Sequence, residues 1–91
     1  MDNYSYPLDP DWTKAELLIV MAFLTQVETA NESGVDKAAF LASYREFKTV
    51  VKSIGEEKKL DREFEQASGY SIYKTVQAAR QTNKKRVKLT K

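Results

Sequence analysis

The stretch at residues 53–73, SIGEEKKLDREFEQASGYSIY, constrains the fold most, because helix start and stop signals follow one another in it. Ser53 and Glu56 have the spacing of a capping box, in which the serine hydroxyl accepts from the Glu56 amide and the glutamate accepts from the Ser53 amide. Gly69 supplies the left-handed residue that commonly ends a helix in a Schellman-type motif. Ser71 then favours the start of another helix.

The helix predicted inside this stretch has a narrow apolar seam and an otherwise charged surface. Residues on the seam side recur at helical spacing, and they are Ile54, Glu57, Leu60, Phe64 and Ala67. The remaining positions are mostly charged, so we expect them to face solvent. A helix of this kind needs other helices to cover its seam.

Two helices are predicted before this stretch. The first starts at Thr13, which forms a capping box with Glu16, and its expected face consists of Leu17, Val20, Met21, Leu24 and Val27, with Phe23 at the edge. Gly34 is expected to end it. The second is capped by Asp36, and its amphipathic stripe consists of Phe40, Tyr44, Phe47 and Val51.

A fourth helix is predicted from about Ile72 to Gln81, with Ile72, Val76 and Ala79 facing inward. We therefore predict an all-α fold, a single small domain of about four helices at residues 1–83. Residues 1–12 are expected to form an N-terminal extended arm, because Pro7 and Pro10 disfavour helix at the residues before them. Residues 84–91 are expected to form a disordered basic tail.

Composition excludes several classes of function. The chain has no cysteine and no histidine, so it lacks a thiolate metal site, a cysteine nucleophile and the commonest general base. Its longest apolar run, Leu17 to Leu24, is far shorter than the roughly 20 residues that a membrane span needs. The polar N-terminal segment is unlike a signal peptide, so a cytoplasmic location without membrane contact is expected.

Positive charge is concentrated in the tail. Residues 84–91 carry five basic side chains, whereas residues 1–83 carry a net charge of −3. The candidate phosphate contacts are Lys84, Lys85, Arg86 and Lys88. Weak RNA or ribosome association through the tail is therefore one alternative function, although the tail has no aromatic residue for base stacking and a solubilising role is favoured.

Another alternative function is a metal-binding protein or enzyme that uses a row of carboxylates. Glu57, Asp61 and Glu65 lie on one helical face, with Glu56 beside them, and such groups can hold Mg²⁺ or Mn²⁺. Basic residues are interleaved with the row, so capping and solvated ion pairs explain it better. We expect no metal, no cofactor and no enzymatic activity.

The leading hypothesis is a non-enzymatic protein-interaction module. Its candidate interaction residues are Arg62, Tyr70 and Tyr73, beside the turn that follows the charged helix. Tyrosine is enriched at interface hot spots, although packing at the rim of the core is the simpler explanation for Tyr73. Leu18 and Ile19 exceed what one helical face needs, so homodimerisation is a further hypothesis.

Several short segments resemble those of one known family. They are YPLD with DW at residues 6–12, EEK at residues 56–58, EFE at residues 63–65 and SGYSIY at residues 68–73. With the sequence around them, they make residues 4–79 similar to Uncharacterised Protein Family 0223, small cytoplasmic proteins of Gram-positive bacteria. The resemblance implies a small all-α fold of about four helices and no known catalytic residues, and it leaves the tail outside the matched region.

Overall fold

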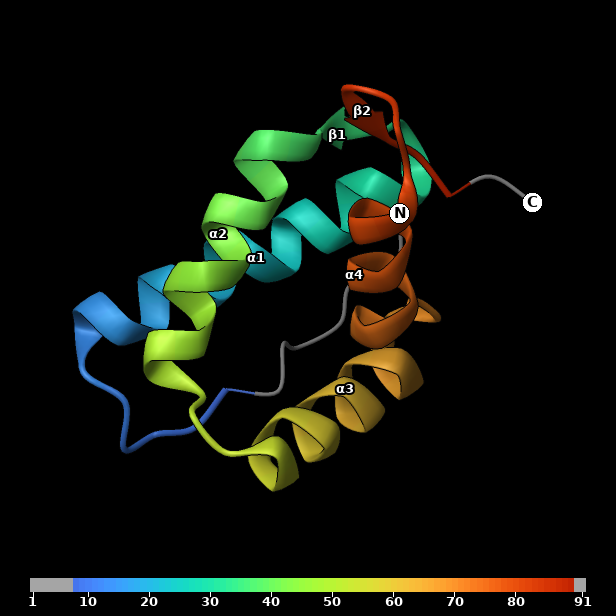
Figure 1. The fold of residues 1–91 in the computed structure, drawn as a ribbon. Helices are drawn as coiled ribbons and strands as arrows, with labels where there is room; N and C mark the ends of the chain where they lie inside the picture. The colour runs from blue at the N-terminus through green and yellow to red at the C-terminus, as the bar shows by residue number, and fades with distance from the viewer. Residues whose placement is uncertain (1–7, 90–91) are drawn as a thin grey trace.

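A computed structural model describes residues 8–89 of the chain. It contains α1 (Lys14–Glu32), β1 (Val35–Asp36), α2 (Lys37–Val50), α3 (Ile54–Ser68), α4 (Ile72–Gln81) and β2 (Arg86–Val87). Figure 1 shows α1, α2 and α4 packed together, with α3 at one end of the molecule and the β1–β2 ribbon at the other. The all-α prediction is confirmed. Within residues 8–89, no helix combines the length and the apolar character needed to cross a membrane.

Capping side chains set the helix boundaries largely as predicted. Thr13 and Glu16 form the complete capping box at the start of α1. The Asp36 carboxylate accepts from the Ala39 amide at the start of α2, and the Ser71 hydroxyl accepts from the Lys74 amide at the start of α4. These bonds satisfy amides that would otherwise lack partners in the first turn.

The start and end of α3 each depart from prediction in one bond. The Ser53 hydroxyl accepts from the Glu56 amide at 3.0 Å, but the Glu56 carboxylate accepts from that hydroxyl rather than from the Ser53 amide. Gly69 is left-handed with φ of 84°, and its amide donates to the Glu65 carbonyl. The Tyr70 amide donates to the Ser68 hydroxyl. The end is therefore a simple left-handed cap rather than a Schellman motif.

The core centres on an aromatic cluster between α1 and α2. Phe23 was predicted at the edge of the inward face of α1, but it is fully buried and stacks on Phe47 with ring centroids 4.6 Å apart. Phe40 lies 5.5 Å from Phe23 by the same measure. Because α1 contacts both α2 and α4, its buried face is turned toward Phe23, while Leu17 and Met21 are only half-buried.

The seam predicted along α3 is buried only in its middle. Leu60 and Phe64 are buried. Ile54, in the first turn, is 69% exposed, and Ala67 is also exposed. The prediction of a continuous inward seam is therefore wrong, because α3 packs mainly against α4 and only its central turns reach the core.

The prediction that the basic tail is disordered is also wrong. β2 pairs antiparallel with β1, placing Val87 opposite Val35 and Arg86 opposite Asp36. Val87 is only 2% exposed and belongs to the hydrophobic core. The tail is therefore part of the domain at least as far as Leu89, which packs against the same core.

The physical reason lies at the end of α1, where helix carbonyls need donors and the last turn has no basic residue. The Arg86 guanidinium donates to the carbonyls of Gly34 at 3.0 Å and Ser33 at 3.3 Å, and the Leu89 amide donates to the Ala30 carbonyl at 2.9 Å. A cation is also favoured at this end of the helix by the dipole. The basic tail therefore supplies the cation and the hydrogen-bond donors that the last turn of α1 lacks.

Part of the predicted N-terminal arm lies outside the described residues, namely residues 1–7, as do residues 90–91 of the tail. Leu8 and Trp12 pack against the core. The Trp12 amide donates to the Asp9 carbonyl at 3.1 Å, so residues 9–12 form a turn. The described part of the arm is thus a packed turn and not an extended segment.

Candidate protein-interaction groove

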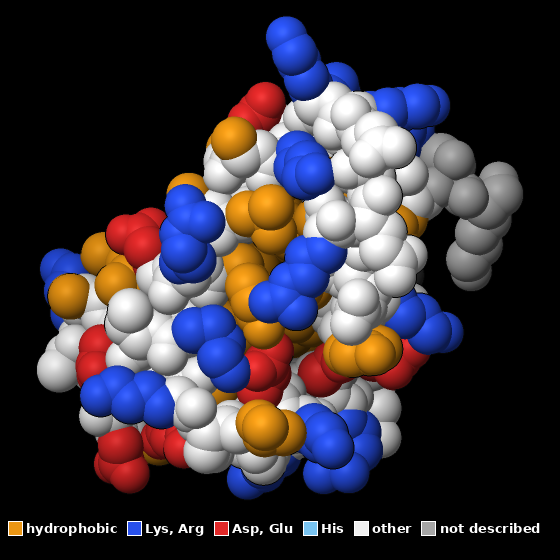
Figure 2. Space-filling view, viewed as in Figure 1, with side chains coloured by type: hydrophobic (Ala, Val, Ile, Leu, Met, Phe, Trp, Pro, Cys, Tyr) orange, Lys and Arg blue, Asp and Glu red, His pale blue; other side chains and the backbone are white. Residues whose placement is uncertain are grey.

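A groove of about 210 Å³ lies between α2, α3 and α4. Its walls include Tyr44 of α2, Ile54 of α3 and both Tyr73 and Val76 of α4. Figure 2 shows apolar side chains in a furrow between α2 and α4, with basic side chains across it and acidic side chains at its lower end near α3. The three helices therefore leave an apolar hollow bordered by charge.

Two large apolar side chains of this groove are unusually exposed. Tyr73 is 65% exposed and Ile54 is 69% exposed, and they lie on different helices. Val76 is buried and Tyr44 is half-buried. The groove thus has a buried apolar floor and an accessible apolar rim.

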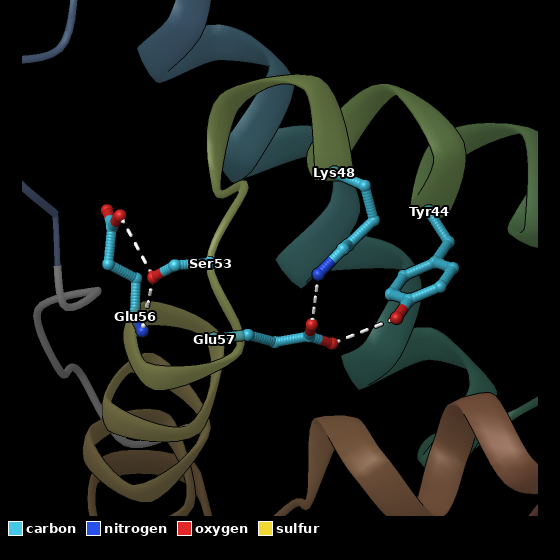
Figure 3. Close-up of polar contacts among 5 residues, drawn as sticks. All are labelled: Tyr44, Lys48, Ser53, Glu56 and Glu57. Atoms are coloured by element: carbon cyan, nitrogen blue, oxygen red, sulfur yellow. Dashed lines mark hydrogen bonds and ion pairs between the residues drawn. The ribbon is translucent and has the colours of Figure 1, made fainter.

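Glu57 joins α3 to α2 at the edge of the groove (Figure 3). One carboxylate oxygen accepts from the Tyr44 hydroxyl at 2.9 Å, and the other forms an ion pair with Lys48. Burial, followed by the hydrogen bond to Glu57, raises the pKa of Tyr44 to about 12. Tyr44 is therefore a neutral donor at physiological pH, and both oxygens of Glu57 are occupied.

Asp61, one turn after Glu57 on α3, joins α3 to α4. Its two oxygens accept from the amides of Ile72 at 2.7 Å and Tyr73 at 3.1 Å. These amides lie at the positive end of α4, where a carboxylate is favoured. Asp61 therefore caps a neighbouring helix and holds the Tyr73 backbone at the rim of the groove.

Arg80 extends over the groove from α4. Its guanidinium carbon lies 5.5 Å from the centroid of the Tyr44 ring, a cation–π arrangement. Arg80 remains exposed. A guanidinium in this position can bind a carboxylate while its flat face rests on the ring.

The three predicted interaction residues do not form one surface. Tyr73 lines the groove, whereas Arg62 is exposed on α3 outside it. Tyr70 packs against the core, and its hydroxyl donates to Glu32 at 2.9 Å. That hydrogen bond, with burial, raises the pKa of Tyr70. The structure therefore places only Tyr73 at the groove.

The predicted phosphate contacts are likewise divided. Arg86 donates to the carbonyls at the end of α1, so its guanidinium already has partners. Lys84, Lys85 and Lys88 are exposed around β2. β2 lies at the end of the molecule opposite α3 (Figure 1).

The carboxylate row has been given structural roles. Glu57 binds Tyr44 and Lys48, Asp61 caps α4, and the Glu56 carboxylate accepts from the Ser53 hydroxyl that caps α3. Across the described residues 8–89, no three acidic side chains come together in a way that could hold a metal ion. Glu57 and Asp61 of the row therefore help to position α3.

Three residues that line the groove were not predicted to have a function, namely Tyr44, Ile54 and Arg80. Tyr44 and Ile54 were placed on inward faces, and Arg80 received no role. One signal was present, because Tyr44 brings a hydroxyl into an otherwise apolar stripe and a buried hydroxyl needs a partner. Nothing in the local pattern around Arg80 points to the Tyr44 ring.

Comparisons with known proteins agree on one family. The sequence pattern of "Uncharacterised protein family (UPF0223)" matches residues 3–88, which include most of the tail. A UPF0223 protein of Enterococcus faecalis is 56% identical over 98% of this chain and 97% of its own length. Others are 54% identical in Lactiplantibacillus plantarum, over 93% of this chain and 88% of the relative, and 45% identical in Bacillus cytotoxicus, over 93% and 96%.

Proposed function

For this chain, which belongs to the uncharacterised protein family UPF0223, we propose a non-enzymatic protein-interaction function exerted through the groove. The observation that carries the proposal is the exposure of Tyr73 and Ile54 on the rim of one apolar hollow. Exposing large apolar side chains to water is unfavourable, and burying them against a partner lowers the free energy of the system. A cytoplasmic location is part of this proposal.

The size of the groove favours a protein partner over a small molecule. Sites for small-molecule ligands and cofactors usually enclose about 300–1,000 Å³, whereas this groove encloses about 210 Å³. It therefore suits one or two side chains of a docked segment. The tyrosine at its rim offers a large rigid surface with a polar tip, which is typical of interface hot spots.

The test compares two exposed apolar side chains. Tyr73→Ala removes the groove rim, and the matched control Leu18→Ala removes a side chain that is 57% exposed on α1 and does not line the groove. Both should unfold within about 0.5 kcal/mol of the original protein, because exposed substitutions are nearly neutral. We expect stoichiometric partner capture from a native lysate to be lost with Tyr73→Ala and kept with Leu18→Ala.

Two opposite results would contradict the proposal. Capture that persists in Tyr73→Ala would remove the groove from the interaction. Loss of capture with Leu18→Ala alone would move the binding surface to α1 and favour homodimerisation through Leu18, which sedimentation of the purified protein would detect.

The ribbon end supports a second candidate, RNA association through Lys84, Lys85 and Lys88. The favouring observation is that all three are exposed on an ordered segment while Arg86 is anchored. Exchanging the three lysines for glutamine should abolish such binding and preserve the fold. Three phosphate contacts would give a log–log salt slope of about −2 on single strands.

A further inference from the structure

We infer that the occupant of the groove is a partner segment that carries a carboxylate beside a large apolar side chain. The inference deepens the proposed function and rests on it. The apolar side chain enters the hollow between Tyr73 and Ile54, and the carboxylate binds Arg80.

The two acids of the groove are already satisfied by the protein itself. Each oxygen of Glu57 has a partner, from Tyr44 or from Lys48. Each oxygen of Asp61 accepts from an amide at the start of α4. Glu57 is neutralised by Lys48, and Asp61 keeps its charge but has both oxygens turned to backbone amides of α4.

The two cations that line the groove, unlike Glu57, have no charged partner within the described residues. Lys58 and Arg80 are both exposed. In the described part of the chain, neither forms an ion pair. The groove is lined by two acids and two cations, and Lys48 of α2, which pairs with Glu57 beside the groove, brings the local net charge to +1. A docked segment with its own carboxylate complements that positive charge.

Arg80 is the better placed of the two cations. Its guanidinium already lies against the Tyr44 ring, so part of its side-chain freedom has been given up before binding. Arginine can also bind a carboxylate through two parallel hydrogen bonds. An apolar side chain in the hollow below would hold the carboxylate in register with Arg80.

The test uses a phage-displayed library of random peptides selected against the full chain. We expect enriched sequences to combine Asp or Glu with Leu, Ile, Phe or Trp. The Kd of a synthetic enriched peptide should rise at least about tenfold in Arg80→Gln, as expected for losing a charged hydrogen bond. It should rise less in Arg80→Lys, and it should not change in Lys74→Gln, an exposed cation of α4 outside the groove.

Several outcomes would overturn the inference. They are enrichment of basic or uncharged peptides, no enrichment at all, or an unchanged Kd in Arg80→Gln whose melting curve shows an intact fold. A Tyr73-dependent homodimer would assign the groove to a second copy instead. Peptides whose binding requires Tyr73 but not Arg80 would contradict the carboxylate-bearing partner and would still support a docking groove. Partner capture that is unaffected by Tyr73→Ala would contradict the proposed function itself.

Discussion

At one end of the molecule, the 15-residue helix α3 contributes two side chains to the core, Leu60 and Phe64. At the other end, the two-residue strand β2 contributes Val87. The helix is joined to its neighbours largely by carboxylates, through Glu57 and Asp61. The ribbon end is joined by backbone hydrogen bonds to α1 and β1 and by the buried valine.

The difference shows that the length of an element does not determine how it is integrated. A long helix with two buried side chains leaves an open groove beside it, whereas a short strand closes the end of α1. The groove end keeps accessible apolar surface, whereas at the ribbon end Arg86 and the Leu89 amide donate to carbonyls within the domain. Mutations at the two ends of the molecule can test this contrast.

The largest expected effect is at Phe64, the fully buried anchor of α3. Phe64→Ala should lower the free energy of unfolding by about 3–5 kcal/mol, because it leaves a cavity and removes buried apolar surface. Ile54→Ala, in the same helix but 69% exposed, should change it by less than about 0.5 kcal/mol. Urea unfolding followed by circular dichroism measures both. Equal small losses would mean that the carboxylates alone hold α3.

Val87→Ala should lower the free energy of unfolding by about 2 kcal/mol, since two buried methyl groups are removed and a cavity remains. The exposed neighbour Lys88 provides the control, and Lys88→Ala should be nearly neutral. The same urea unfolding experiment separates them. If both variants matched the original protein, the ribbon end would be loosely attached and the contrast with α3 would fail.

The two left-handed glycines lie in different surroundings, one at each end of the molecule, so replacing them with alanine compares the packing of the two ends. Gly69 has open space where a Cβ would lie, so Gly69→Ala should cost about 1 kcal/mol from backbone conformation alone. At Gly34, with φ of 100°, a Cβ would meet the Arg86 guanidinium at 3.0 Å and the Lys88 Cβ at 3.3 Å. Gly34→Ala should therefore cost more, about 2 kcal/mol. Equal melting temperatures for the two variants would show that the tail does not press on Gly34.

The smallest effect concerns the hydrogen bond between Tyr44 and Glu57. The folded protein raises the pKa of Tyr44 to about 12, so the bond stabilises the fold fully below the unfolded value of about 10. That stabilisation is lost as pH rises toward 12, when the phenol ionises. The stability difference between the original protein and Tyr44→Phe should narrow over this interval. A stability difference that stays constant up to pH 12 would contradict the raised pKa of Tyr44, which burial and the hydrogen bond to Glu57 together produce.

Local signals predicted the helices well. Thr13, Asp36 and Ser71 begin helices where their hydroxyl or carboxyl groups cap the first turn, because a capping bond involves residues only a few positions apart. The burial of Phe40 and Phe47 likewise follows from the spacing within α2. Such signals can be found within one or two helical turns of sequence.

The tail and the groove depend on distant partners, and the local pattern does not contain them. Val87 becomes part of the core only because Val35 offers a strand to pair with. The exposure of Ile54 depends on where α3 is held, which Asp61 decides by binding the first amides of α4. The groove could therefore be found only after the helices had been placed.

The pairing of β1 with β2 also affects the order in which the chain folds. Helices and their nearest contacts form from residues close in sequence, whereas this pairing must close a loop that spans α2, α3 and α4. Closing so long a loop is entropically costly, so we expect it to come late in folding. Weakening the ribbon should then accelerate unfolding and leave the refolding rate almost unchanged. The pairing of Val35 with Val87 would then set the unfolding rate, and with it the lifetime of the native state.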